Sequence, residues 1–305
     1  LKLDSVSTFE CIVEGSEHYF MEVNTRIQVE HRVTEMVYKL EFMNPNNPED
    51  KFTVDSLVAS MLLLKCYGKR LSCPKRIPRF LSGVEARLNS TNTALKPHAG
   101  GILSEWSVPD EKEIRDDQGI GISNPDTGML QPYKLAGAYD SNVALSITNG
   151  DSRRECFEKL ADVLRCMKFR GIDLQLNIDF QYGLLQWMLG NDPMLKPNTS
   201  FVSSYLALAG KLKRLCDQIN LDVAWDINRE KIKSDFGPEG LLICDKKFTL
   251  ILRPLKILFE RPHLLMGWLA LLKAKTEESR HSNKQNPVNI LVNLYNYLRL
   301  EKNSD

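Results

Sequence analysis

The stretch Tyr19–His31, which reads YFMEVNTRIQVEH, decides how the beginning of this chain is interpreted. It opens as a short alternation of apolar and polar residues, which is typical of a β-strand. Every second position from 22 to 30 then holds a charged or amide side chain: Glu22, Asn24, Arg26, Gln28 and Glu30. Because neighbouring side chains on a strand point to opposite faces, these five share one face if the strand stays extended. The stretch therefore predicts a strand with a row of functional groups along one side.

A second alternating run, Phe9–Val13, precedes the first and is joined to it by a short connection that contains Gly15. Two such runs around a glycine turn predict an antiparallel hairpin. The hairpin can place Glu10 against Glu22 and Asn24. Two carboxylates and one amide oxygen form a set of hard oxygen ligands, which suits Mg²⁺ held jointly by protein and nucleotide phosphates.

The remaining groups of the row suit a small planar oxyanion such as bicarbonate. The guanidinium of Arg26 can bind it through two parallel hydrogen bonds, Gln28 can donate beside it, and Glu30 can accept its proton. For any single one of these residues, an exposed polar position on a half-buried strand is the favoured alternative. The ordered series of suitable residues weakens that alternative, whereas His31 is interpreted as structural.

The eighteen residues Tyr19–Met36, YFMEVNTRIQVEHRVTEM, resemble the signature of biotin carboxylases, the ATP-grasp component of acetyl-CoA, propionyl-CoA and pyruvate carboxylases. Thr8–Glu10 is similar to the family's strand that bears the first metal-binding Glu. Looser similarities extend the resemblance over about residues 5 to 192, and they lie at Glu85–Asn89, Pro97–Ile102, Ala138–Ser141 and Arg170–Asn177.

The resemblance implies a role for each matching residue. Glu10 and Glu22 would bind ATP, and Glu10, Glu22 and Asn24 would bind Mg²⁺ or Mn²⁺. Arg26, Gln28 and the backbone of Val29 would contact bicarbonate. Glu30 would be the catalytic base, with Arg26 and Arg87 as further catalytic residues, Arg87 stabilising the biotin enolate.

The resemblance also implies an α+β fold in three parts. Residues 1–45 would be the end of an ATP-grasp domain, residues 46–192 the C-terminal domain of a biotin carboxylase with an antiparallel sheet and packed helices, and residues 193–305 a mainly helical connecting region. Apolar spacing and capping residues predict helices at Thr34–Leu40, Val54–Tyr67, Arg153–Met167, Leu174–Leu189, Phe201–Asn220 and Pro287–Leu300. Asn44–Asp50 predicts a loop, and short helical pieces mixed with loops are expected between Asn220 and Pro287.

Composition narrows the classes of function. Lys+Arg 40 against Asp+Glu 39 gives a net charge of +1, which offers no support for a nucleic-acid or membrane partner. The seven cysteines are spread singly, as expected of reduced thiols in a cytoplasmic protein. The most apolar stretch, Leu250–Leu272, is interrupted by ionisable residues and prolines, so a membrane span is not expected.

Departures from the family pattern point to a divergent, multidomain carboxylase that acts on an acyl-CoA or a related acceptor. Arg32 stands where a Pro is usual, Leu145 stands where a Lys is common, and the spacing from Glu30 to Arg87 is long. The chain begins at Leu1 within a strand-like pattern, and a glycine-rich phosphate lid and an ATP-binding Lys are not found before the hairpin. We therefore expect a C-terminal portion that is inactive alone.

Partners follow from what the sequence lacks. No M-K-M biotin-attachment segment is present, so biotin would arrive on a carrier domain, and a carboxyltransferase domain would use it. The parent enzyme is expected to be a homo-oligomer. Two alternatives stay open: another ATP-grasp ligase of the carbamoyl-phosphate synthetase kind, and a non-catalytic docking module of a carboxylase complex.

Overall fold

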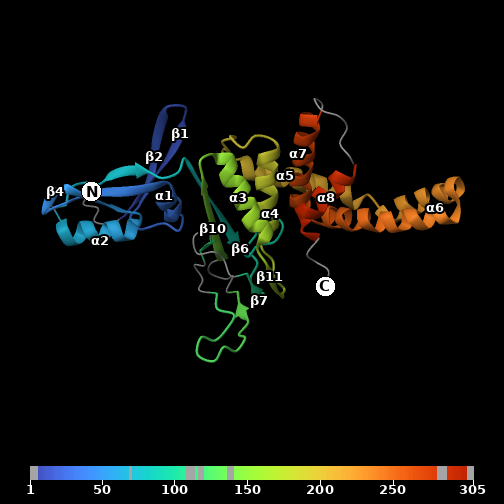
Figure 1. Cartoon of the computed structure of the whole chain (residues 1–305), viewed down its shortest axis with the longest axis horizontal. Coiled ribbons are helices and arrows are strands. Elements are labelled where there is room, and N and C mark those ends of the chain that lie inside the picture. The colour runs from blue at the N-terminus through green and yellow to red at the C-terminus, as the bar shows by residue number, and fades with distance from the viewer. Residues whose placement is uncertain are drawn as a thin grey trace. The chain divides into compact units, whose positions relative to one another are not determined.

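The computed structural model describes residues 6–68, 71–107, 114–115, 120–135, 141–279 and 287–300 (Figure 1). The fold mixes helix and sheet, as predicted. Two compact units are present. The first holds the described chain up to Ala86 together with residues 114–115 and Leu145–Leu160, and the second holds the rest from Arg87 onward. The two units are separated by how densely their residues contact one another. The division of the sequence into three domains at residues 45 and 192 stays a prediction.

The first unit opens with the predicted hairpin. Strand β1 (Thr8–Glu14) pairs antiparallel with β2 (Glu17–Asn24), and the turn between them contains Gly15 at φ 60°. A left-handed φ of this kind is favourable for glycine, which lacks a Cβ. A register shift between Glu10 and Cys11 marks a β-bulge. The hairpin prediction is therefore confirmed.

Two predictions after the hairpin were wrong. The helix expected at Thr34–Leu40 is α1 (His31–Val37), and it is followed directly by strand β3 (Tyr38–Asn44). The expected loop Asn44–Asp50 is only a two-residue turn, because strand β4 (Asn47–Val54) begins at Asn47. Hydrogen bonds from Asn44 Nδ2 to Asp50 Oδ2 (2.9 Å) and from Asn46 N to Asn44 Oδ1 (3.0 Å) close this turn.

Strand β3 is the centre of a three-stranded antiparallel sheet in the order β4-β3-β5, with β5 at Lys75–Pro78. Phe42 is fully buried and stacks on Phe52 of β4, with ring centroids 5.6 Å apart. Residues 51–54 pair with β3, so helix α2 (Leu57–Tyr67) begins three residues later than predicted. Ser56 caps α2 by accepting a hydrogen bond from Ala59 N, and Gly68 ends it, as predicted.

The remaining strands form two further three-stranded sheets. One has the order β6-β10-β8, from β6 (Ser82–Asn89), β10 (Asn142–Gly150) and β8 (Ile114–Arg115). The other has the order β11-β7-β9, from β11 (Phe169–Ile172), β7 (Ile102–Trp106) and β9 (Tyr133–Lys134). Of the segment 138–141 that resembles the family's turn, residues 138–140 lie outside the described residues.

Helix α3 (Arg153–Cys166) follows β10 and has the predicted cap. Ser152 Oγ accepts from Glu155 N at 3.1 Å, while Glu155 Oε2 accepts from Asp151 N at 2.8 Å. This reciprocal arrangement satisfies backbone donors that a helix start leaves unpaired. Helix α4 (Ile178–Gly190) begins four residues later than predicted and ends at the predicted Gly190.

The described chain after Asn191 is mainly helical, as expected. Its helices are α5 (Phe201–Asp217), α6 (Leu221–Glu260), α7 (Pro262–Ser279) and α8 (Pro287–Leu298). Instead of short pieces, α6 is two arms joined at Gly237, where φ is 68°. Ion pairs Asp222–Lys256 (3.0 Å) and Arg229–Asp245 (3.2 Å) join the arms, so they form an antiparallel helical hairpin (Figure 1).

Within the described residues, no helix combines the length and the apolar character that crossing a membrane requires. All seven cysteines carry free thiols. Cys156 is buried and its Sγ contacts the Ser82 carbonyl at 3.1 Å, and burial raises the pKa of this thiol. Its packing is that of a small structural residue.

A buried histidine lies in the core of the helical part. The ring of His263 on α7 stacks on Tyr205 of α5 with centroids 5.8 Å apart and meets Phe180 of α4 edge-on. Its Nε2 contacts the Thr93 carbonyl at 2.9 Å and therefore carries the proton, whereas Nδ1 is buried and has no partner in the described part of the chain. Burial lowers the pKa of His263, while the Thr93 carbonyl and the charge of Asp179 oppose that shift.

We expect the stability of this core to fall in mild acid. Because the pKa of His263 is lower in the folded than in the unfolded chain, the unfolded chain binds the proton first. Stability is therefore full above about pH 6.5 and decreases as the pH falls toward the folded pKa, by up to about 1.4 kcal/mol per pH unit. Urea unfolding between pH 7.5 and 5 measures the slope. His263→Phe should flatten it and the exposed His18→Gln should leave it unchanged, and equal slopes in all three proteins would contradict the assignment.

Candidate active site

The functional row begins with a cluster of two carboxylates and two amides, in which Glu10, Glu22 and Asn24 lie on the hairpin and Gln28 follows it. Glu10 of β1 lies directly opposite Glu22 of β2 in the register of the strands. Asn24 Nδ2 donates to Glu10 Oε1 at 2.6 Å and to Glu22 Oε1 at 3.3 Å, and Gln28 Nε2 donates to Glu10 Oε1 at 3.2 Å. The structure thus brings four of the predicted site residues together.

This arrangement has an electrostatic cost that an ordinary strand pair avoids. Like charges placed directly opposite each other in an antiparallel pair are destabilising. The amide donors of Asn24 and Gln28 offset part of the repulsion at Glu10. A bound cation would remove it, so the donor set fits a hard divalent cation. Within the described ranges, no group of three or more His, Cys, Asp or Glu side chains is placed to hold a metal ion. The cluster has only two carboxylates, and the amide of Asn24 would be its third ligand.

The prediction that Arg26, Gln28 and Glu30 continue the face of Glu22 was wrong. Strand β2 ends at Asn24, whose partner Thr8 is the first residue of β1, so the strand has no further pairing on β1. Hydrogen bonds from His31 N to Gln28 O (3.2 Å) and from Val33 N to Glu30 O (3.0 Å) turn the backbone into α1 instead. Without a pairing partner, the extended conformation is not maintained.

The three residues consequently point in different ways. Gln28 turns back toward Glu10, and Arg26 is exposed, with its Nη1 donating to the Ile27 carbonyl at 3.2 Å. Glu30 is the exposed N-cap residue of α1, but its side chain makes no capping hydrogen bond. Val29 is half-buried in the same turn.

His31 has the structural role that the sequence suggested. Its Nδ1 contacts the Gln28 carbonyl at 2.8 Å, and its Nε2 lies 3.8 Å from Glu35 Oε1. These contacts tie the first turn of α1 to the connection from β2. Glu35 in turn accepts a hydrogen bond from Leu57 N at 2.7 Å, which joins α1 to α2.

Arg87 lies on β6 in the second unit, and its side chain is exposed between the buried Ala86 and Leu88. The backbone beside it is held by Asn177, the N-cap residue of α4. Asn177 Nδ2 donates to Arg87 O at 3.0 Å, and Asn177 Oδ1 accepts from Asn89 N at 2.8 Å. The sequence did not assign this positioning role to Asn177, although it stands at the end of a segment that resembles the family.

Comparisons with known proteins show what this chain is similar to. The family model described as "Carbamoyl-phosphate synthase L chain, ATP binding domain" matches residues 1–44. The biotin carboxylase of Halalkalibacterium halodurans is 27% identical over 169 residues, which are 55% of this chain and 32% of that protein. Biotin carboxylase 1 of Bacillus subtilis is 30% identical over 185 residues, 59% of this chain and 35% of that protein.

One larger protein and one solved structure are also similar to the chain. The mitochondrial methylcrotonoyl-CoA carboxylase subunit alpha of Glycine max is 28% identical over 209 residues, 66% of this chain and 24% of that protein. Among solved structures, the biotin carboxylase domain of Hydrogenobacter thermophilus 2-oxoglutarate carboxylase matches with a TM-score of 0.49 and 22% identity, over 66% of this chain and 39% of that one.

The chain is therefore similar to the biotin carboxylase type of ATP-grasp protein, whose members are ATP-dependent ligases. It spans about a third of the length of the biotin carboxylases that it matches. The similarity rests on sequence relatives at 25–30% identity as well as on the motif described above.

Proposed function

We propose that this chain is the C-terminal portion of a biotin carboxylase, in an enzyme that uses Mg-ATP and bicarbonate to carboxylate biotin. The carboxyl group would then pass to an acyl-CoA or a related acceptor. The observation that carries the proposal is the placement of Glu10 opposite Glu22, with Asn24 between them. Paired carboxylates beside an amide provide the hard oxygen ligands that Mg²⁺ or Mn²⁺ takes with nucleotide phosphates.

Glu10, Glu22 and Asn24 would hold the metal ion, and Glu10 and Glu22 would contact ATP through it. When bound, the ion would neutralise phosphate charge and orient the nucleotide. For binding, the Asn24 amide would present Oδ1 in place of the Nδ2 that now donates to Glu10. Two hydrogen bonds between protein groups would thus be exchanged for one ligand bond.

Arg26 would bind bicarbonate through its guanidinium fork, which has one contact to the neighbouring carbonyl of Ile27. The amide of Gln28 and the backbone of Val29 would complete the oxyanion contacts. Glu30, whose carboxylate makes no capping hydrogen bond, would accept the proton of bicarbonate. Arg87 would stabilise the biotin enolate, because a guanidinium stays protonated beside a developing anion.

The organisation of the parent enzyme belongs to the same proposal. Residues 1–45 would end an ATP-grasp domain, residues 46–192 would form the C-terminal domain of the biotin carboxylase, and residues 193–305 would connect to further domains. A biotin carboxyl carrier domain and a carboxyltransferase domain would be its partners in a cytoplasmic homo-oligomer. The chain alone would be inactive, because the hairpin and Arg87 cannot enclose ATP and exclude water.

The direct test measures ATP cleavage by the full-length polypeptide and by residues 1–305. We expect the full-length protein to cleave ATP only when bicarbonate and biotin are both present, and the 305-residue chain to show no such activity. Cleavage that needs bicarbonate but not biotin would instead favour a ligase of the carbamoyl-phosphate synthetase kind. Biotin-dependent cleavage by the 305-residue chain would refute its inactivity.

A further inference from the structure

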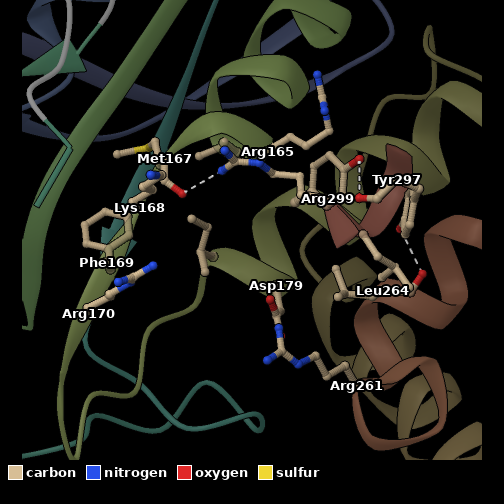
Figure 2. Close-up of a pocket in the computed structure, with 14 residues that line it drawn as sticks. Arg165, Met167, Lys168, Phe169, Arg170, Asp179, Arg261, Leu264, Tyr297 and Arg299 are labelled. Carbon is tan, nitrogen blue, oxygen red and sulfur yellow. Dashed lines mark hydrogen bonds and ion pairs between the residues drawn. The ribbon is translucent and has the colours of Figure 1, made fainter. Parts of the chain in front are cut away.

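A cationic cavity of about 350 Å³ lies in the second unit, apart from any residue given a role above (Figure 2). It is bounded by the end of α3, strand β11, the start of α4, the start of α7 and the end of α8. Five of its lining side chains are cationic, and they are Arg165, Lys168, Arg170, Arg261 and Arg299. Asp179 is the one acidic residue among the fourteen that line it.

The cavity keeps a positive excess after its ion pairs are considered. Arg261 Nη1 lies 3.6 Å from Asp179 Oδ2, and Arg170 Nε lies 3.3 Å from Glu105 Oε2 outside the cavity. Arg165 Nε similarly lies 3.5 Å from Asp162. Among the described residues, Lys168 and Arg299 have no carboxylate partner, so two positive charges stay uncompensated.

Arg299 lines the cavity and has an unusual backbone conformation. It follows α8 with φ 55°, a left-handed conformation that is uncommon for a residue with a side chain. Its side chain extends across the cavity, where Nη1 donates to the Met167 carbonyl at 3.3 Å (Figure 2). Its Nε is buried and has no hydrogen-bond partner among the residues that the structure describes. A buried unpaired guanidinium donor is costly, and an acceptor entering the cavity would satisfy it.

Two helix starts add to the positive potential. Ile178 and Asp179 are the first residues of α4, and Leu264 lies in the first turn of α7, which begins directly after Arg261. The start of an α-helix carries a partial positive charge and unpaired N–H groups, which favour anions. Burial raises the pKa of Asp179, against the charges of Arg261 and His263. The ionised form of the Asp179 carboxyl is therefore less stable than that of an exposed carboxyl.

We propose that this cavity binds a small ligand through a diphosphate group. Arginines at several positions around one cavity match the many acceptor oxygens of a diphosphate, and their planar forks bind such oxygens two at a time. A volume of about 350 Å³ lies at the lower end of the range for ligand sites. The source of the diphosphate is either the free anion or a nucleoside diphosphate. The inference does not depend on the proposed carboxylase function.

Isothermal titration of the 305-residue chain with inorganic pyrophosphate, and separately with ADP, tests the proposal. We expect pyrophosphate to bind one site, with an affinity that falls as salt rises. Arg299→Gln and Arg261→Gln should each weaken binding by roughly tenfold or more, since each removes a charge-assisted hydrogen-bond donor. Arg229→Gln, on α6 and outside the cavity, is the matched control and should bind like the unaltered chain.

A third variant at the exposed Arg170 tests the proposal if Arg299→Gln and Arg261→Gln do not fold. Arg170→Gln leaves the buried contacts intact and should also weaken pyrophosphate binding. ADP binding that is stronger than pyrophosphate binding, and that is lost in the same variants, identifies a nucleoside diphosphate as the ligand. Equal affinities identify the free diphosphate. Absence of pyrophosphate binding, or binding unchanged in all three cavity variants, would overturn the proposal.

Discussion

Gly183→Ala is expected to destabilise the helical part of this protein by about 3 kcal/mol or more. Helices α4 and α7 pack with almost no separation at this glycine, and a Cβ there would overlap the His263 carbonyl oxygen and lie within 3.2 Å of Leu264 N. Both neighbours belong to the backbone, so no side-chain rotation can relieve the clash. The helices would have to move apart along their whole contact.

The same close approach recurs along both helices, which is why local relief is not available. A Cβ on Gly190 would lie 2.7 Å from the Ala270 carbonyl oxygen. A Cβ on Gly267 would lie 2.7 Å from the Gly183 carbonyl oxygen and 2.6 Å from the Tyr297 hydroxyl. Separation at one glycine therefore loosens the packing at the other two.

Chemical denaturation followed by far-UV circular dichroism measures the loss. The matched control is Gly210→Ala in α5, where the nearest neighbour of a new Cβ is the Arg214 side chain at 3.8 Å. That change should stabilise the protein by about 0.5–1 kcal/mol, because alanine favours the helix more than glycine does. Equal stability of Gly183→Ala and the unaltered protein would show that α4 and α7 are not packed as described.

Glu30→Gln should reduce biotin-dependent ATP cleavage by the full-length polypeptide by roughly 10²- to 10⁴-fold. The amide has nearly the same size as the carboxylate but cannot accept the proton of bicarbonate. Because Glu30 makes no capping hydrogen bond, its replacement should leave α1 and the hairpin unchanged. The KM for ATP should stay the same, since Glu10 and Glu22 are untouched.

Steady-state kinetics with varied ATP and bicarbonate separate these effects. Glu14→Gln, at the end of β1 and outside the cluster, is the control and should retain the activity of the unaltered enzyme. Unchanged carboxylation by Glu30→Gln would reject the general-base assignment. It would favour the alternative in which this region is a non-catalytic docking module of a carboxylase complex.

The parts of the fold that local chemistry determines were predictable from the sequence. The glycine turn at Gly15, the Ser56 and Gly68 ends of α2, and the Ser152 cap of α3 each depend on neighbouring residues. The hairpin that carries Glu10 and Glu22 was predictable for the same reason, because its two strands are adjacent in sequence. The register of the turn alone would place Met21 opposite Glu10, and the bulge between Glu10 and Cys11 brings Glu22 there instead.

The parts that long-range contacts determine were not predictable. The row beyond Asn24 required a pairing strand, and β1 provides none because it begins at Thr8, the partner of Asn24. Tyr38–Leu40 continued a helical spacing from Thr34, but pairing with β4 and β5 on both sides makes this segment the start of strand β3. The cationic cavity depends on contacts such as that of Arg299 with Met167, which are 132 positions apart. A pattern among neighbouring residues in the sequence cannot predict a contact between residues so far apart.

The helical hairpin of α6 has a consequence for the order in which this part of the chain folds. Its contacts are nested around Gly237, with Arg229 and Asp245 separated by 16 positions and Asp222 and Lys256 by 34. Once the inner pair has formed, the outer pair closes only a short additional loop, so the entropy loss at each step is small. His263 reaches Thr93 across 170 positions, a closure with a much larger entropy loss. We therefore expect the turn at Gly237 to nucleate early, and the α4–α7 core to assemble afterwards.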